Sequence, residues 1–401
     1  MASNKYSVFI LTMILFMPVA RFDIYYAVII PMVCLCYLFG QKIIVNVQGK
    51  YLIWLLLGLI FFALAKSMVF QNPYDLKELF KLGTFVIIFL STRHIKLQVL
   101  QQLFLCYISV NFLFSILEFL HVSNFVTELV SNLYHSKNHS EFALNVNSTR
   151  ALGLSAGPGQ QGGLSLLLFA FFLTCCVFDK NTKICILGGF LSFVCILLSQ
   201  SKTAILGALI FGIIFLAIVT MHKKIGTLLI MLMPVILIAA GFTYYLEWIL
   251  GVFYEVQRLT ENGLAVSSFV ARLSLWEMQT SAVLDSNALF MLFGAGRGYL
   301  ESKALYHNSF DNDYVYMLVQ FGLVGFIAFI SMLFVSIFRG LWIFRHLNVI
   351  RKSILMILIA GSICALSLDF FSDLKIISVL AFLLGMAVYE PSSRYSPSPR
   401  C

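Results

Sequence analysis

Long apolar segments alternate with short polar ones from near the start of the chain to residue 389. An α-helix of about 20 apolar residues crosses the hydrocarbon core of a bilayer and satisfies its own backbone hydrogen bonds there. The pattern therefore predicts an all-α, polytopic integral membrane protein, in which residues 1–401 form a single membrane domain of about 12 transmembrane helices. The predicted spans are residues 6–20, 24–40, 51–65, 79–90, 97–120, 162–178, 184–200, 203–221, 225–245, 314–338, 353–368 and 374–389.

The fourth span, residues 79–90, is the weakest of these predictions, because it is short and carries Lys81 near its start. Without it, the orientation of part of the chain would invert. We interpret the apolar stretch within Met1–Ala20 as the first helix and not as a signal peptide, since it lacks a clear cleavage site and continues into another apolar segment.

Basic residues concentrate on alternate turns between the predicted spans. If the amino terminus is cytoplasmic, the cytoplasmic segments hold many lysines and arginines, and their only acidic residues are Asp179 and Glu390. Lysine and arginine close to a span resist translocation across the membrane. The charge pattern thus predicts a multi-pass protein with both termini in the cytoplasm.

Composition agrees with this class of protein. Only 11% of the residues are charged and 60% are hydrophobic, whereas roughly 25% are charged in a soluble domain, so a single water-soluble globule is excluded. The net charge of +9 follows from the topology, and we expect no nucleic-acid partner. The nine cysteines lie in apolar runs or at the last residue and lack the spacing of a metal site, so we interpret them mainly as small apolar residues.

Two long loops lie on the outer side in this topology, at residues 121–161 and 246–313, and they hold most of the polar chemistry. Within the second loop, residues 269–284 place Phe269, Leu273 and Trp276 near one stripe, which predicts a helix lying in the membrane interface. Residues 391–401, rich in serine and proline, are predicted to be a disordered cytoplasmic tail.

The first loop ends in a glycine-rich segment that runs from Arg150 to Gly163 and enters an apolar span. Glycines allow a backbone to approach another group closely, and free N–H groups before a helix favour an anion. Arg150 and this backbone would then bind an anion; the alternative is a flexible loop with an ordinary capped helix start. The segment is not a P-loop, because no Gly-Lys-Ser/Thr follows.

Further cations are predicted on the same side of the membrane. Lys202 lies in the turn Ser199–Thr203, which is alternatively an ordinary turn with Thr203 capping the next helix. Arg258, Arg272 and Arg297 lie in the second loop. The planar guanidinium matches two phosphate oxygens, so these residues form a candidate pyrophosphate site, although each alone could simply contact solvent or lipid headgroups.

His307 precedes the span at residues 314–338 and is a candidate general base, because a neutral imidazole accepts a proton near neutral pH. Asp311 could orient its ring. Asn308, Ser309 and Asp311 are also residues expected to cap a helix. No HExxH or G-x-S-x-G motif occurs, and few charges fall inside the spans.

Taken in order, these motifs resemble those of the bacterial O-antigen polymerases (Wzy type) and O-antigen ligases. The resemblance rests on a glycine-rich arginine segment, a Ser-x-Ser-Lys/Arg-Thr turn, Arg-x-x-x-Trp, Gly-x-Gly, and His-Asn before a span. In this chain they are Arg150–Gly163, Ser199–Thr203, Arg272–Trp276, Gly294–Gly296, and His307–Asn308 followed by Gln320–Gly325.

The resemblance implies a GT-C-like fold and a glycosyltransferase that works at the periplasmic face of the bacterial inner membrane without metal or other cofactor. A polymerase would transfer glycan from undecaprenyl pyrophosphate to the end of a second lipid-linked repeat unit, with a chain-length regulator as partner. It implies that Arg272 and Arg150 hold the donor pyrophosphate and that His307 activates the acceptor hydroxyl. Lys202 stands where arginine is common, and Arg258 and Arg297 are weaker matches.

Three alternatives remain at the level of sequence. An O-antigen ligase would use lipid A core as the acceptor. A flippase or other transporter of lipid-linked oligosaccharide would have internal repeats and polar residues at mid-membrane depth, and neither is evident. A non-catalytic assembly protein would tolerate replacement of His307 or Arg272 without a change in glycan length.

Overall fold

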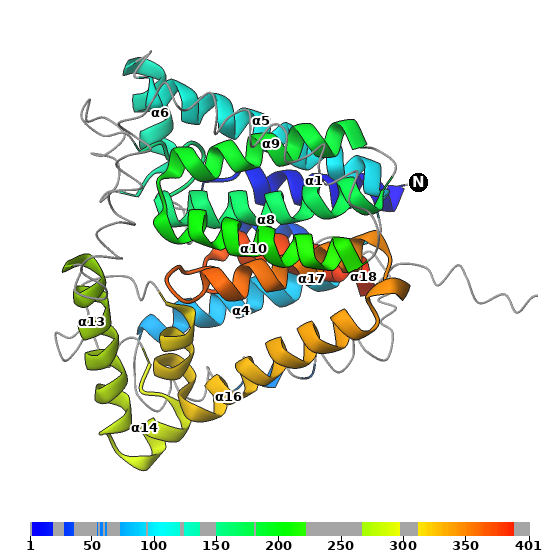
Figure 1. The fold of residues 1–401 in the computed structure, drawn as a ribbon. Coiled ribbons are helices and arrows are strands. Elements are labelled where there is room, and N and C mark those ends of the chain that lie inside the picture. The colour runs from blue at the N-terminus through cyan, green and yellow to red at the C-terminus, as the bar shows by residue number, and fades with distance from the viewer. Residues whose placement is uncertain are drawn as a thin grey trace, which may run out of the picture.

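The protein is described by a computed structural model in which residues 2–18, 28–35, 73–93, 95–120, 124–136, 150–179, 182–221, 267–296 and 312–388 are placed, with single positions at 54, 57, 58 and 61. These residues form helices and turns and include no strand (Figure 1). The helices are α1 (Ala2–Phe16), α4 (Pro73–Ser91), α5 (Leu97–Phe119), α6 (Asn124–Tyr134), α8 (Pro158–Phe178), α9 (Thr182–Ser199), α10 (Lys202–Met221), α13 (Ser267–Leu284), α14 (Ala288–Phe293), α16 (Asp313–Trp342), the 3-10 turn η3 (Phe344–His346), α17 (Val349–Cys364) and α18 (Leu374–Val388).

The all-helical prediction is confirmed for this part of the chain. Among the described helices, α5, α8, α9, α10 and α16 are long and apolar enough to cross a membrane, and α1, α4 and α18 contain shorter apolar stretches. The doubtful fourth span is a real helix, because α4 continues well before and around Lys81. The predicted span 225–245 lies outside the described residues, as do most of 24–40 and 51–65.

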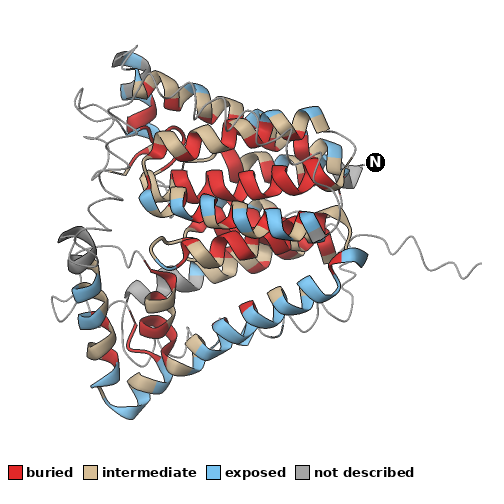
Figure 2. Ribbon diagram, in the orientation of Figure 1, coloured by how far each residue is buried: buried red, intermediate tan, exposed pale blue. Residues whose placement is uncertain are grey.

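Helix α8 forms the centre of the bundle. It packs against α9, α17, α5, α10 and α18, and every residue from Gln161 to Val177 is buried (Figure 2). A helix that is apolar on all sides has no face suited to water. Its predicted start at residue 162 was four residues late, because Gly157 is the N-cap and Pro158 occupies the first turn.

The helix ends alternate between two ends of the bundle. At one end, Arg93 N donates to Ser7 Oγ (3.0 Å), and Gln101 Nε2 donates to Asp179 Oδ2 (2.8 Å). The same end holds Lys352, whose Nζ lies 4.5 Å from the centre of the Phe178 ring. We call this the basic end. The opposite end, which carries the glycine-rich segment, is called the site end.

Helix α16 leaves the bundle at an angle and exposes apolar side chains such as Ile327, Phe334 and Phe338 (Figure 2). Such a surface suits lipid. The helix bends at Gly322, whose φ of 66° and ψ of −168° interrupt the helical geometry. Its first part packs with α13 and α14 around a small second core of Val283, Ala295, Tyr316, Val319 and Phe321 (Figure 1).

Candidate functional site

The site end brings the glycine-rich segment beside the turn between α9 and α10. Ala151 N donates to the carbonyl of Leu198 (3.0 Å). Within α8, a Cβ added to Gly162 would lie 2.6 Å from Ala204 Cβ, so the amino-terminal part of α8 and the start of α10 are in close contact. Arg150 and Lys202, both exposed, therefore start from adjoining backbone segments.

The turn that carries Lys202 is tightly shaped. Gln200 has a φ of 48°, in the left-handed region, and Ser199 Oγ accepts from Ser201 N (3.2 Å). Lys202 is the first residue of α10. The alternative in which Thr203 caps this helix is wrong, since Thr203 lies inside α10 and the cap contact is from Ala204 N to Ser201 Oγ (3.5 Å).

Arg272 reaches the same end from α13. Its side chain is half-buried, and Nη1 donates to Ser367 Oγ (2.6 Å) in the turn between α17 and α18. The last residue of α17, Cys364, contacts the Thr203 carbonyl through Sγ (3.7 Å). The end of α17 and the turn after it therefore contact both the segment with Lys202 and the side chain of Arg272. Residues 267–284 do form the predicted helix.

The start of α16 is tied to the turn between α17 and α18. Asn312 Oδ1 caps the helix by accepting from Tyr314 N (2.9 Å) and Val315 N (3.1 Å). The buried Asp313 carboxylate accepts from Phe371 N and Ser372 Oγ, both at 2.6 Å. His307, Asn308, Asp311, Arg258 and Arg297 lie outside the described residues. The predicted cap residues are therefore not placed, and Asn312 is a cap that the sequence analysis missed.

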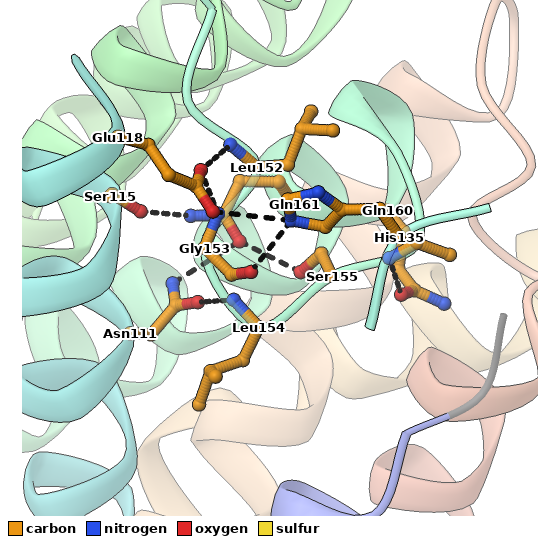
Figure 3. Close-up of polar contacts among 11 residues, drawn as sticks. Asn111, Ser115, Glu118, His135, Leu152, Gly153, Leu154, Ser155, Gln160 and Gln161 are labelled. Carbon is orange, nitrogen blue, oxygen red and sulfur yellow. Dashed lines mark hydrogen bonds and ion pairs between the residues drawn. The ribbon is translucent and has the colours of Figure 1, made fainter. Parts of the chain in front are cut away.

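Three consecutive backbone N–H groups of the glycine-rich segment donate to side chains of α5 (Figure 3). Leu152 N and Gly153 N donate to Oε2 of Glu118, at 2.7 and 2.9 Å, and Leu154 N donates to Asn111 Oδ1 (2.8 Å). The expectation of an open backbone is wrong at Leu152, Gly153 and Leu154, because the Glu118 carboxylate and the Asn111 amide oxygen of α5 accept these N–H groups. The flexible-loop alternative is wrong for residues 151–155, all of which are buried.

A second set of side chains supports the same segment. Gln161 Oε1 accepts from Ser155 Oγ (2.7 Å) and from Asn111 Nδ2 (3.2 Å), and Gln161 Nε2 donates to Ser115 Oγ (3.1 Å). His135, which follows α6, places Nε2 3.2 Å from Glu118 Oε1 and 3.1 Å from the Gly153 carbonyl oxygen (Figure 3).

The amino end of α18 closes this network from the other side. Asp373 Oδ2 accepts from Gln160 Nε2 (2.7 Å), while its Oδ1 caps α18 by accepting from Lys375 N (3.0 Å) and Ile376 N (2.9 Å). Burial raises the pKa of the Asp373 carboxyl above its ordinary value, although the hydrogen bonds and Lys81 oppose the shift.

Lys375 was also missed from the sequence. Its buried Nζ lies 3.3 Å from the Leu154 carbonyl and over the rings of Tyr107 (5.3 Å) and Tyr134 (5.8 Å). The one sequence feature that could have drawn attention to Lys375 is its position as a lysine in the first turn of an otherwise apolar predicted span.

Two of the predicted motifs meet at the bend of α16. Gly296 N donates to the Val319 carbonyl (3.0 Å). A Cβ on Gly294, whose φ is 83°, would lie 2.6 Å from the backbone of Gln320. The Gly-x-Gly turn and the Gln320–Gly325 segment are therefore a backbone joint that fixes α14 against α16.

Residues 187–330 match the Wzy_C family model, which is described as O-antigen ligase. The family resemblance is confirmed. The Wzy_C segment contains Lys202, Arg272, the Gly-x-Gly turn and the bend of α16, whereas Arg150 and the network around Glu118 lie before it. No curated protein matches the chain.

Proposed function

We propose that this protein is a polysaccharide polymerase of the Wzy type, a glycosyltransferase that acts without metal on undecaprenyl-pyrophosphate-linked oligosaccharide. It would work in the bacterial inner membrane, with the site end facing the periplasm, both termini in the cytoplasm and a chain-length regulator as partner. The Wzy_C match at residues 187–330 supports an enzyme of the O-antigen ligase and polymerase family with a lipid-linked oligosaccharide substrate.

One observation carries the proposal: three segments with a candidate cation converge on the site end. Arg150 is brought to this end because its neighbour Ala151 is hydrogen-bonded to Leu198 of α9. Lys202 is the first residue of α10, and Arg272 is hydrogen-bonded to Ser367. Cleavage of the sugar C1 bond releases a pyrophosphate, whose growing negative charge needs fixed positive partners. Arginine and lysine side chains supply them.

His307 completes the proposed reaction as the base that removes the proton of the acceptor hydroxyl. It lies six residues before Asp313, whose carboxylate is fixed to the α17–α18 turn, and the same turn holds Arg272 through Ser367. In this proposal Arg272 and Arg150 bind the donor pyrophosphate, with Lys202, Arg258 and Arg297 as further cations and Asn308 and Asp311 orienting the base. Attack on C1 from the side opposite to the pyrophosphate would invert the anomeric centre.

A second candidate is an O-antigen ligase, favoured by the description of the family model. We favour the polymerase because its loops tolerate divergence such as lysine at position 202. A transporter is less favoured, because the buried charges of the described residues, Glu118, Asp313 and Lys375, lie at helix ends on the site end and not at the middle of the spans.

The proposal is tested by the lipopolysaccharide ladder of cells that lack this protein and carry wild type, Arg272→Ala or His307→Ala. Arg345→Ala, an exposed arginine at the basic end, is the matched control. A polymerase gives a single core-plus-one-repeat band with the null strain and both site variants, since loss of a group that stabilises transition-state charge costs about 10² to 10³ in rate. The control restores the full ladder.

Other outcomes assign other functions. Bare core together with accumulated lipid-linked polymer would identify a ligase. An unchanged ladder in the null strain, with membrane expression of the complementing proteins verified, would reject a glycosyltransferase of this pathway.

A further inference from the structure

Glu118 and His135 form a buried pair outside the proposed donor-binding residues. Glu118 is 2% exposed and His135 is fully buried. Glu118 comes from the last turn of α5 and His135 from the end of α6, yet both contact Gly153 of a third segment. Burial of a carboxylate is costly unless hydrogen bonds and opposite charge compensate it. These two residues therefore need an explanation beyond apolar packing.

The contacts are all directed at the segment that begins with Arg150. Oε2 of Glu118 accepts the N–H groups of Leu152 and Gly153, and His135 Nε2 holds the Gly153 carbonyl. Gly153 has a φ of 51°, a conformation that glycine adopts readily. A Cβ there would lie 2.5 Å from Asn111 Oδ1. The backbone two and three residues after Arg150 is thus fixed from both sides.

We call the contacts of Glu118 and His135 with Leu152 and Gly153 the Glu118 clamp. A neighbouring hydrogen bond connects this clamp to the turn that carries Lys202. Ala151, between Arg150 and the clamped Leu152, donates its N–H to Leu198 at the end of α9, directly before the turn that carries Lys202. The backbone beside Arg150 is therefore held at Leu152 and Gly153 by Glu118 and at Ala151 by α9. Asn111 and Gln161 hold only the part of the segment from Leu154 onward.

We propose that Glu118 and His135 are positioning residues that hold Arg150 beside the start of α10, so that Arg150 and Lys202 meet the donor pyrophosphate together. This inference rests on the proposed function of Arg150. The pair touches neither the donor nor the acceptor and acts through the backbone of Leu152 and Gly153.

The geometry also defines what His135 must supply. The Gly153 carbonyl can only accept, so Nε2 carries a hydrogen, and Nδ1 has no hydrogen-bond partner among the described residues. A glutamine side chain can place an N–H near the position of Nε2, whereas leucine cannot. His135→Gln therefore retains the hydrogen bond to the Gly153 carbonyl, and His135→Leu removes it.

The test uses the full-length protein in nanodiscs and measures the Kd for radiolabelled undecaprenyl pyrophosphate. Arg150→Ala, Glu118→Ala and His135→Leu are expected to raise the Kd about tenfold, which corresponds to about 1.4 kcal/mol. His135→Gln stays within about twofold of wild type. Gln101→Ala is the matched control, because it removes a polar contact of α5 at the basic end, to Asp179.

Hydrogen–deuterium exchange of peptides covering residues 150–157 provides a readout that does not depend on the ligand. Exchange rises in Glu118→Ala and His135→Leu and remains at the wild-type level in His135→Gln and Gln101→Ala. If Glu118→Ala fails to fold, Glu118→Gln takes its place, since glutamine keeps an acceptor for the two N–H groups but loses the charge; a smaller increase in Kd and exchange is then expected.

The two proposals fail in different ways. Wild-type Kd values in both Glu118 variants and His135→Leu would overturn the positioning role and leave the donor site intact. An equal loss of affinity in His135→Gln and His135→Leu, with unchanged exchange, would overturn it as well, because His135 would then act through its ring chemistry. Absence of binding by the wild type would instead reject Arg150 as a donor-binding residue, and the inference with it.

Discussion

The glycine-rich segment shows how far single residues could be understood from sequence. Five glycines after Arg150 predicted a close approach of the backbone to another group, and the structure contains one. The partner could not be predicted, because Glu118 is distant in sequence and a carboxylate near a helix end gives no sign of what it will accept. Lys375 was missed for the same reason, since its partners Leu154, Tyr107 and Tyr134 come from three other segments.

Ser367 is predicted to set the position of Arg272. Ser367→Ala removes the oxygen that accepts from Nη1 at 2.6 Å, and a lost hydrogen bond to a half-buried charged group costs about 1 kcal/mol, or roughly fivefold in rate. The ladder should then shift to shorter chains, measured by band intensities. Ser362→Ala is the control, because among the described residues the Ser362 hydroxyl donates to the Leu358 carbonyl of its own helix. Equal ladders for the two variants would contradict the prediction.

Asp373 is predicted to make stability depend on pH. Its pKa in the folded protein is raised by burial above the ordinary 3.8. As the pH rises through that ordinary value, the unfolded chain ionises first, so the free energy of unfolding falls until the pH exceeds the raised value. Asp373→Asn removes this loss. Thermal unfolding in detergent from about pH 4 to about pH 7 should decline less in the variant than in wild type; parallel curves would refute the assignment.

At the scale of elements, helix positions were predictable where a bilayer demands long apolar runs: α5, α8, α9, α10 and α16 each overlap a predicted span. The bend of α16 was not predictable. The sequence around Gly322 reads as a continuous apolar helix, and the reason for the break is the turn Gly294–Gly296, which packs against it from a separate segment. Helix α6, inside the predicted outer loop, was also missed: it is short, and its large apolar side chains Phe125, Leu129 and Leu133 are exposed.

Gly322→Ala is predicted to disturb the joint between α14 and α16. A Cβ at this position would overlap Gly294 N and the Leu292 carbonyl group, and φ is in the left-handed region. The positive φ and the overlap each cost about 1 to 3 kcal/mol. We expect a lower unfolding temperature in detergent and shorter glycan chains. Gly212→Ala, with nothing within 4 Å of the added Cβ, should keep wild-type values; a loss of stability there would show that the assay reports any glycine change.

At the scale of the whole molecule, the charge pattern predicted that successive helices end alternately on the two sides of the membrane. The contacts between the described helix ends agree with this alternation. The turns with Arg93, Asp179 and Lys352 share the basic end, while those with Leu198 and Ser367 share the site end (Figure 1). The count of about 12 spans remains a prediction, because residues 222–266 and most of 36–72 lie outside the described part.

The orientation of the two ends is tested with phosphatase fusions, which are active only outside the cytoplasm. A fusion after His346 at the basic end should be inactive, and one after Asp369 at the site end should be active, because lysine and arginine near span ends remain in the cytoplasm. Fusion levels are compared by immunoblot. The reverse pattern would place the proposed site on the wrong side for a periplasmic enzyme.

The carboxylate of Glu118 has a consequence for inhibition. A cradle of backbone N–H groups would hold a small soluble anion such as phosphate or sulfate, but in this protein the N–H groups of Leu152 and Gly153 are already saturated by an internal anion. A competing anion would have to be attracted mainly by cationic side chains, of which Arg150 and Lys202 are exposed, and attraction at exposed charges is weak and screened by salt. Effective competitors should therefore owe most of their affinity to a lipid tail embedded in the bilayer, and soluble phosphate or sulfate should compete only weakly.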